Sequence, residues 1–132
     1  MTIVGAAIVD DRGRVLGAAR AEPPEMAGMW EFPGGKVEPG ESELAALVRE
    51  CQEELGVTVS VRERLGNDIM LGNGRAVLKV WLAEVADGEP EAREHAELRW
   101  LAVEELDDVS WLPADAPLVD DLRRVLRSMS GR

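Results

Sequence analysis

Three glutamates in the middle of the chain have a spacing that places them on one face of a helix. Glu50, Glu53 and Glu54 stand at positions i, i+3 and i+4, and residues so spaced are neighbours on a helix surface. Like charges this close destabilise an exposed helix by about a few tenths of a kcal/mol per pair. Hard cations such as Mg²⁺ take oxygen ligands of this kind. The cluster therefore predicts a divalent metal site, with a solvated acidic face as the alternative.

The helix that carries these glutamates is predicted by its apolar residues. Ser42 is placed to cap its N-terminus, and Gly56 stands where a C-terminal cap glycine is expected. The stripe repeats with helical period, and we expect the three glutamates to lie away from it. It consists of Leu44, Leu47, Val48, Cys51 and Leu55.

The remaining elements are predicted to be strands and one further helix. Pro117 opens that helix, whose apolar stripe ends at Met129. Turns are expected at 11–13, 33–35, 72–74 and 87–88, and a loop over 21–29. The order of elements predicts an α+β fold of α/β/α type, a mixed sheet between two helices, in a single domain over 1–132. The predicted strands are Thr2–Asp10, Arg14–Arg20, Trp30–Phe32, Val57–Leu65, Ala76–Val85 and Glu97–Ala102.

The charge balance excludes some partners. The chain has 26 acidic and 15 basic residues, a formal charge of −11, which disfavours nucleic-acid polymers and anionic membranes. A polyphosphate can still bind where a divalent cation inverts the local charge. The sequence holds no apolar run of the ~20 residues that span a bilayer, and one cysteine, Cys51, suits a reducing compartment. We expect a cytoplasmic protein, a monomer or a weak homodimer.

The glutamates belong to a longer pattern. It reads Gly, five residues, Glu, seven residues, Arg-Glu-apolar, one residue, Glu-Glu, one residue, Gly-apolar, and it resembles the signature of the Nudix hydrolase superfamily over 23 residues. That family cleaves phosphoanhydride bonds with a divalent metal, so the resemblance implies the Nudix fold and a Mg²⁺ cofactor, with Mn²⁺ as a substitute. The matching positions are Gly35, Glu41, Arg49, Glu50, Cys51, Glu53, Glu54, Gly56 and Val57.

The resemblance also implies roles for single residues. The carbonyl of Gly34 joins Glu50, Glu53 and Glu54 around the metal, and Glu94 matches a further ligand or base. Arg49 and Glu41 orient the carboxylates, and Gly35 allows close backbone approach. Glu50 or Glu53 takes a proton from the attacking water. For Glu94 a solvated loop position is the alternative.

Substrate choice rests on residues outside the signature. The run 30–38, Trp-Glu-Phe-Pro-Gly-Gly-Lys-Val-Glu, resembles the MutT branch, which includes CTP pyrophosphohydrolase-like members. By this resemblance Arg20 contacts the nucleotide, Lys36 meets phosphate, and Arg75 is a further substrate-binding candidate. Phe32 either walls the base pocket or belongs to the core. The only histidine, His95, has no second His or Cys at ligand spacing, and we expect it to be structural or solvent-exposed.

The base preference depends on Asp115. MutT-type 8-oxo-dGTP hydrolases resemble this chain but carry Asn at the position after Pro113-Ala114. An ionised Asp only accepts hydrogen bonds, and cytosine offers its N4 amino group as a donor. Asp115 therefore favours CTP or dCTP, including modified cytosine nucleotides. Its alternative role is to cap the last helix.

The sequence thus predicts a Mg²⁺-dependent nucleoside triphosphate pyrophosphohydrolase that releases the monophosphate and pyrophosphate, with CTP or dCTP as its substrate. Three alternatives stay open. Two lie within the family, namely an 8-oxo-dGTP diphosphatase and a hydrolase of ADP-ribose or nucleotide sugars. The third, a binding module without catalysis, is disfavoured by the intact carboxylates.

Overall fold

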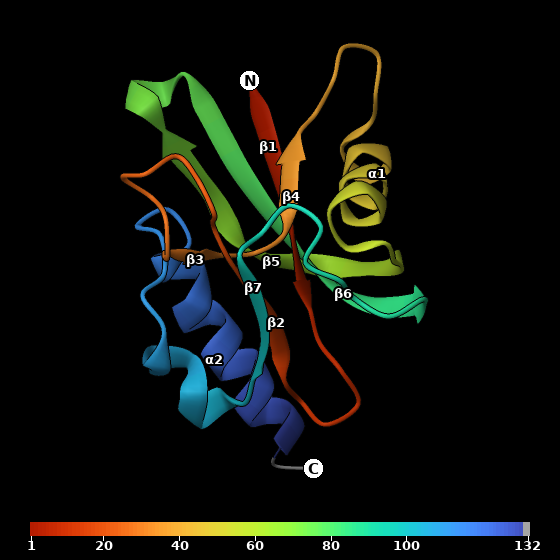
Figure 1. The fold of residues 1–132 in the computed structure, drawn as a ribbon, viewed down its shortest axis with the longest axis vertical. Coiled ribbons are helices and arrows are strands. Elements are labelled where there is room, and N and C mark those ends of the chain that lie inside the picture. Colours follow the sequence, from red (N-terminus) through yellow and green to blue (C-terminus); the bar gives the residue numbers. More distant parts are fainter. Residues whose placement is uncertain (131–132) are drawn as a thin grey trace.

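The computed structural model describes residues 1–130, and its strands form two sheets flanked by two helices (Figure 1). A four-stranded mixed sheet has the order β4-β1-β6-β5, with β1 and β6 parallel, and a three-stranded antiparallel sheet has the order β3-β2-β7. The elements are β1 (Thr2–Ile8), β2 (Val15–Ala19), β3 (Trp30–Glu31), β4 (Gly34–Lys36), α1 (Glu43–Leu55), β5 (Thr58–Leu71), η1 (Gly72–Gly74), β6 (Ala76–Asp87), β7 (Glu97–Leu101), η2 (Val103–Asp108) and α2 (Ala116–Ser130).

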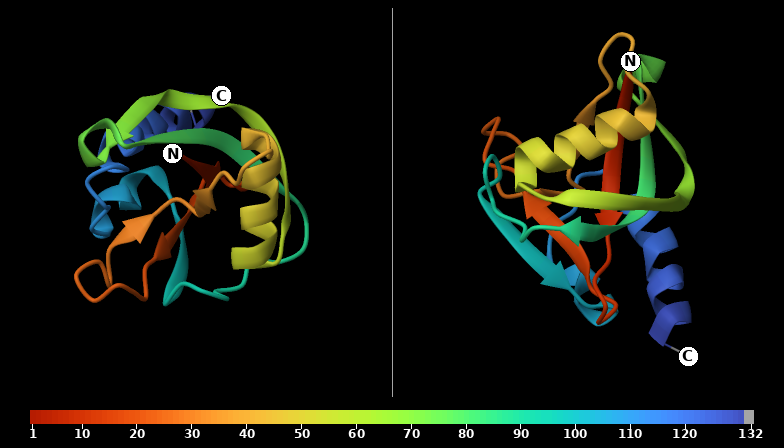
Figure 2. Two further views of the ribbon diagram at one scale, coloured as in Figure 1. Left: turned by 90° about the horizontal axis from the view of Figure 1, so that it is seen from above. Right: turned by 90° about the vertical axis from the view of Figure 1, so that its right-hand side faces the viewer.

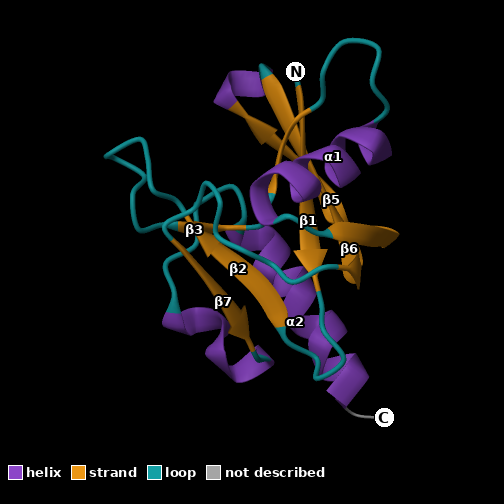
Figure 3. Ribbon diagram, turned by 45° about the vertical axis from the view of Figure 1, so that its right-hand side comes forward, coloured by secondary structure: helices purple, strands orange, loops and turns teal. Residues whose placement is uncertain are grey.

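Alternation along the central strands explains why the helices lie on different faces. In β1, Val4 and Ile8 pack in the cluster under α1, whereas Ala7 packs in the cluster under α2. Successive residues of a strand point to opposite faces, so one strand supplies both cores. In Figure 2, α1 and α2 lie against different parts of the sheets. In Figure 3 the strands lie between the two helices. The predicted α+β, α/β/α fold is confirmed, with the strands divided between two sheets.

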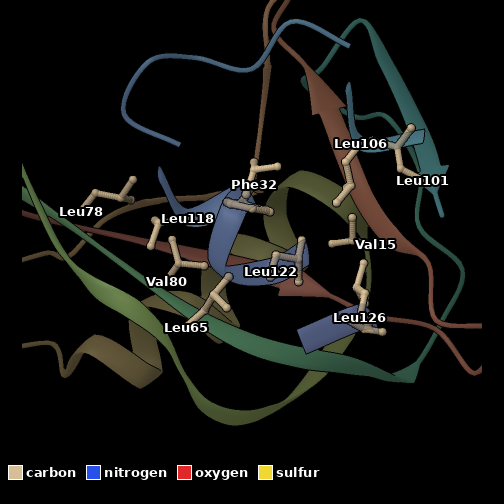
Figure 4. Packing of buried hydrophobic residues seen from close by; sticks show 13 residues of the cluster. Val15, Phe32, Leu65, Leu78, Val80, Leu101, Leu106, Leu118, Leu122 and Leu126 are labelled. Atoms are coloured by element: carbon tan, nitrogen blue, oxygen red, sulfur yellow. The ribbon is translucent and has the colours of Figure 1, made fainter. Parts of the chain in front are cut away.

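The core under α2 is the larger of the two clusters. Leu118, Leu122 and Leu126 are fully buried and belong to one cluster with Leu65 and Val80 of the sheet (Figure 4). Burying side chains of this size stabilises the fold by about 1.5–3 kcal/mol each. Met129, predicted in the same stripe, is 43% exposed, so the stripe faces the core only in its earlier turns. Among the described residues, no helix is long and apolar enough to cross a membrane.

Apart from shifts of one or two residues at the ends of elements, the structure differs from the prediction in three places. Strand β5 continues to Leu71 because bulges after Val61 and Leu65 absorb the break in apolar alternation. The predicted turn at 33–35 contains a short strand, β4, in which Gly34 pairs with Gly5. The segment η2 was not predicted; within it the Glu105 carboxylate accepts a hydrogen bond from the N–H of Ala102 at 2.9 Å.

Candidate active site

Helix α1 has the predicted caps, and they fix the register of its glutamates. The Ser42 hydroxyl accepts a hydrogen bond from the N–H of Ala45 at 3.1 Å. Gly56 adopts the left-handed conformation, and its N–H donates to the carbonyl of Gln52 at 3.0 Å. Because both ends are fixed, the register of the helix is defined, and it directs Glu50 and Glu54 toward β4.

The buried face of α1 is rotated relative to the predicted stripe. Leu44 and Val48 are 47% and 37% exposed, whereas Leu47 and Cys51 are fully buried. Glu54 lies three residues after Cys51, on the same helical row, and is only 8% exposed. The expectation that all three glutamates lie away from the apolar face is therefore wrong for Glu54.

Arg49 organises the exposed carboxylates. Its Nε and Nη2 donate to the two oxygens of Glu41 at 2.7 and 2.9 Å, and its Nη1 donates to Glu50 at 2.8 Å and Glu53 at 3.3 Å. Nη2 also donates to the carbonyl of Lys36 at 3.0 Å. The hydrogen bonds from Arg49 are the main cause that lowers the pKa of Glu41 to about 2. This geometry supports the orienting role that the family resemblance implies for Arg49 and Glu41.

Glu54 and Glu50 connect α1 to the glycines of β4. A Glu54 oxygen accepts a hydrogen bond from the N–H of Gly34 at 2.9 Å. A side chain at Gly34 would lie 1.9 Å from the carbonyl oxygen of Val4, and one at Gly35 would lie 2.4 Å from the Glu50 carboxyl carbon. Gly34 is therefore needed for β4 to lie this close to β1, and Gly35 for helix α1 to approach the strand this closely.

The donor set suits a hard divalent cation. Burial raises the pKa of Glu54, and the charges of Glu31 and Glu50 add to the effect. Burial also raises the pKa of Glu50, where Arg49 opposes and the charges of Glu53 and Glu94 reinforce it. A bound cation relieves such repulsion among buried carboxylates.

The carboxylates of Glu50, Glu53 and Glu54 do not converge on a single point. Over residues 1–130, no three His, Cys, Asp or Glu side chains converge closely enough to hold a metal ion by themselves. Their other partners account for this, since Arg49 holds Glu50 and Glu53, and the N–H of Gly34 holds Glu54. The residues fit Mg²⁺ in their chemistry, because each of these hydrogen bonds uses one carboxylate oxygen and leaves the other oxygen of Glu50, Glu53 and Glu54 for a cation.

A second cluster, which we call the Glu31 corner, lies beside the glutamates and contains Arg20, Glu31, His95 and Asp115. Arg20 Nη1 donates to Glu31 at 3.0 Å, and His95 Nε2 lies 2.9 Å from the other Glu31 oxygen. Part of the corner lines a pocket of about 120 Å³, so Arg20 and Glu94 share one pocket with Glu54. The pocket is lined by Arg20, Ala21, Glu22, Glu31, Glu54, Glu94 and His95.

His95 is buried, so the predicted solvent exposure is wrong, although a structural role is compatible with its position. The N–H of Ala96 bonds to the carbonyl of Ala19 at 2.9 Å and holds this segment against the end of β2. Burial lowers the pKa of His95, but the hydrogen bond to Glu31 and the charge of Glu54 outweigh it, and the net pKa is raised. His95 is thereby tied to the candidate site.

Asp115 reaches the same corner through the segment before α2. Trp30 in β3 bonds to the carbonyl of Ser110 at 2.9 Å and to the N–H of Leu112 at 2.8 Å. Asp115, 5% exposed, then accepts a hydrogen bond from the backbone N–H of Phe32. Burial and the charge of Glu31 raise its pKa from 3.8 to about 7. Asp115 therefore exists in both ionised and protonated forms near neutral pH.

The other predicted substrate residues are more scattered. Phe32 is buried in the core cluster, with its ring centroid 5.2 Å from that of Trp111, which favours its core alternative. Lys36 is exposed at the end of β4. Arg75 lies at the tip of the β5–β6 hairpin, where its carbonyl accepts a hydrogen bond from the amino group of Met1 at 3.1 Å. It is thus outside the Glu31 corner and outside the polar group around the helix, which we call the α1 cluster and which consists of Glu41, Arg49, Glu50, Glu53 and Glu54.

A larger hollow of about 1040 Å³ lies elsewhere, along β6 and α2. Leu82, Trp100 and Val125 line it, and none of the described residues predicted for the site does. Its size does not make it the active site, because the candidate metal and nucleotide residues lie together around the small pocket.

Two residues of the corner, Glu31 and His95, were not predicted as functional. Two features of the sequence could have indicated them. Glu31 stands between two aromatic residues, Trp30 and Phe32, and the single histidine follows Glu94. Neither feature specifies a partner, because the contact between Glu31 and His95 joins segments 64 residues apart along the chain.

Fold and site together define an α+β hydrolase in which a carboxylate-bearing helix faces a glycine-containing strand. The family profile described as NUDIX domain matches residues 1–126. The chain belongs to the Nudix family, in its MutT and CTP pyrophosphohydrolase-like branch, and it is a nucleotide pyrophosphohydrolase.

Three similar proteins show where the chain lies within the family. A Mycobacterium tuberculosis protein named "Putative 8-oxo-dGTP diphosphatase 2" is 50% identical over 128 residues, which cover 94% of this chain and 89% of the relative. The CTP pyrophosphohydrolase of Escherichia coli is 41% identical over 121 residues, covering 91% and 90%. The solution structure of the E. coli ORF135 protein has a TM-score of 0.79 and 38% identity, covering 97% of this chain and 91% of that one.

Proposed function

We propose that this protein hydrolyses 8-oxo-dGTP to 8-oxo-dGMP and pyrophosphate with Mg²⁺, and so removes an oxidised nucleotide from a cytoplasmic pool. Of the two curated relatives above, the one with the higher identity is the protein named for 8-oxo-dGTP. These relatives therefore support the alternative from our sequence analysis more than its first choice, CTP or dCTP.

The observation that carries this proposal is the state of Asp115. The argument for cytosine assumed an ionised carboxylate, but burial raises the pKa of Asp115 to about 7. A protonated carboxyl has a donor and an acceptor side by side, as an Asn does. 8-Oxoguanine presents the O6 acceptor beside an N7–H donor, so protonated Asp115 is complementary to it.

The α1 cluster provides the chemistry at the phosphates. Glu50, Glu53 and Glu54, with Glu94 and the carbonyl of Gly34, would hold Mg²⁺, which neutralises phosphate charge and acidifies a water. Glu50 or Glu53 accepts the proton of the attacking water. The water oxygen bonds to phosphorus as a phosphoanhydride bond breaks, and pyrophosphate leaves.

The remaining proposed contacts hold the substrate. Arg49 with Glu41 keeps the carboxylates oriented, and Gly35 leaves room for Glu50. Arg20 contacts the nucleotide from the Glu31 corner, and Lys36 meets the phosphates. Arg75, on the hairpin tip, and Phe32, in the core, are weaker candidates for direct contact. We expect the enzyme to act as a monomer or a weak homodimer.

Hydrolysis of CTP or dCTP is the second candidate. It is favoured by the 41% identical CTP pyrophosphohydrolase and by the ionised form of Asp115, which accepts a hydrogen bond from the cytosine N4 amino group. The two activities respond differently to pH, because raising the pH through about 7 ionises Asp115.

The test is pyrophosphate release from 8-oxo-dGTP, dGTP, CTP, dCTP and ADP-ribose with Mg²⁺ and with Mn²⁺, at pH 6.5 and 8.5. We expect 8-oxo-dGTP to have the highest kcat/KM at pH 6.5 and its lead over CTP to shrink at pH 8.5. A lead for CTP or dCTP at both pH values would replace the proposal with the second candidate. Absence of metal-dependent turnover of every nucleotide would contradict both.

A further inference from the structure

Glu31 links three segments of the nucleotide site. It lies in β3 between the buried side chains of Trp30 and Phe32, and its own side chain is 15% exposed. One oxygen accepts a hydrogen bond from Arg20 at 3.0 Å, and the other lies 2.9 Å from Nε2 of His95. The end of β2, β3 and the segment before β7 therefore meet at this one carboxylate.

The contacts of Glu31 also restrict Arg20. The Arg20 Nε donates to the carbonyl of Glu22 at 3.0 Å while its Nη1 donates to Glu31. Two hydrogen bonds from different nitrogens fix both the position and the plane of a guanidinium. Because Arg20 and Glu31 line the same small pocket as Glu94, an anchored Arg20 presents its charge there without further ordering.

Glu31 is coupled to Asp115 through the backbone. The residue after Glu31, Phe32, gives its N–H to the Asp115 carboxyl. The Asp115 side chain is thus held one residue away from Glu31, inside a buried corner where charges interact strongly.

We propose that Glu31 is a positioning residue that determines base specificity, because it anchors Arg20 and because its negative charge acts on the base-reading carboxyl of Asp115. The inference rests on the proposed function for its substrate, 8-oxo-dGTP. Glu31 needs no contact with the reacting phosphates for this role.

The electrostatics agree with the geometry. Burial is the main cause that raises the pKa of Asp115, and the charge of Glu31 raises it further, while the Phe32 N–H and Arg20 lower it. Glu31 itself is faced by Arg20, His95, Glu54 and Asp115. Removing the charge of Glu31 therefore lowers the pKa of Asp115 and reduces its protonated fraction near neutral pH.

The experiment uses Glu31→Gln, which keeps the shape and one acceptor oxygen for Arg20 and places an amide N–H donor toward His95, and Glu31→Ala, which removes the anchor. For each protein the ratio of kcat/KM for 8-oxo-dGTP to that for CTP is measured from pH 6 to 8.5. General effects of pH on hydrolysis cancel in this ratio. We expect Glu31→Gln to lose the 8-oxo-dGTP preference at lower pH than the wild type, and Glu31→Ala to raise KM about tenfold with a smaller change in kcat.

A direct titration keeps the inference testable whatever the substrate is. The Asp115 carboxyl is followed by ¹³C NMR in protein labelled at Asp, with Asp115→Asn for assignment, and its midpoint should fall in Glu31→Gln. Glu84→Gln is the matched control, because Glu84 is a strand glutamate paired with Arg62 at 3.2 Å outside the pocket. It should leave the titration and the ratio unchanged.

The two proposals fail in different ways. If the wild type does not hydrolyse 8-oxo-dGTP, the proposed function fails, while the NMR titration still tests the effect of Glu31 on Asp115. If the wild type is active and folded Glu31→Gln shows the wild-type Asp115 titration and the wild-type pH dependence of the ratio, the role of Glu31 is overturned.

Discussion

The α1 cluster and the Glu31 corner are both rich in carboxylates, yet only the α1 cluster pairs three of them with one guanidinium. Around α1, Glu41, Glu50 and Glu53 share the guanidinium of Arg49, and the pKa of Glu41 is lowered to about 2. In the corner, Asp115 is buried near Glu31, and its pKa is raised to about 7. Glu41 therefore keeps its charge, although burial raises the pKa of Glu50 and Glu54 in the same cluster, whereas Asp115 gains and loses a proton near neutral pH.

This difference matches two tasks. A divalent cation that binds phosphates needs carboxylate ligands, and Arg49 orients Glu50 and Glu53 for it. Reading a base edge depends on which hydrogen-bond donors and acceptors are present, and the protonation of a single carboxyl changes that set. The α1 cluster is therefore expected to determine the rate of hydrolysis, and the Glu31 corner the choice of base.

The largest effect is expected for Glu53→Gln. Losing a carboxylate that ligates the metal, or that accepts the water's proton, should lower kcat/KM by about 10²–10⁴-fold for every substrate. The ratio between 8-oxo-dGTP and CTP should stay the same, since the corner is intact. Glu63→Gln, an exposed glutamate of β5, is the control. A changed ratio in Glu53→Gln would show that the two regions are not separable.

Arg49→Lys should have a smaller effect of the same kind. Lysine has no planar fork, so it cannot bind both oxygens of Glu41 and reach Glu50 as well. We expect a loss of roughly 10–100-fold in activity or Mg²⁺ affinity, measured by Mg²⁺ titration of the initial rate. Arg62→Lys, which changes an exposed pair with Glu84, should have no effect. Wild-type Mg²⁺ dependence in Arg49→Lys would argue against the orienting role.

Asp115→Asn should change specificity and its pH dependence. Asn keeps a donor and an acceptor at every pH, whereas the protonated fraction of a group with a pKa of about 7 falls roughly 30-fold by pH 8.5. The variant should therefore hold its 8-oxo-dGTP preference at pH 8.5, where the wild type loses most of it. Steady-state kinetics at pH 6.5 and 8.5 measure this, with the exposed Asp120→Asn as control. Parallel profiles for variant and wild type would refute base reading by Asp115.

The last expected effect is on the stability of the fold and not on catalysis. A carboxyl whose pKa is raised on folding, from 3.8 to about 7, contributes stability below its unfolded pKa, and this is lost as the pH rises through the folded pKa. The free energy of unfolding of the wild type should thus fall between pH 4 and pH 7, by on the order of 2–4 kcal/mol from Asp115. Urea denaturation in EDTA should show a shallower decline for Asp115→Asn. Glu54 contributes a slope of the same sign in both proteins.

The fold and the α1 cluster were largely predictable because their determinants are local. The helix 43–55 with its Ser42 and Gly56 caps follows from apolar period and cap chemistry. The register of Glu50, Glu53 and Glu54 then follows from helix geometry alone. Even so, the burial of Glu54 was missed, because it depends on how far the helix is rotated against β4.

The end of β5 and the strand β4 were not predictable from periodicity. The residues after Leu65 interrupt the alternation, and only pairing with β6 through bulges keeps them in the sheet. The two glycines of β4 have no strand propensity of their own. Their pairing with β1 and the close approach of Glu50 define their conformation.

By itself, the sequence determined the family, the class of reaction and the helix that bears the carboxylates, because these depend on residues within one continuous segment. Tertiary structure alone decided which groups meet in the Glu31 corner. Arg20, Glu31, His95 and Asp115 come from four separate segments that are brought together by strand pairing. The protonation of Asp115 is a consequence of that meeting, since burial and the charge of Glu31 raise its pKa, and neither exists until the chain has folded.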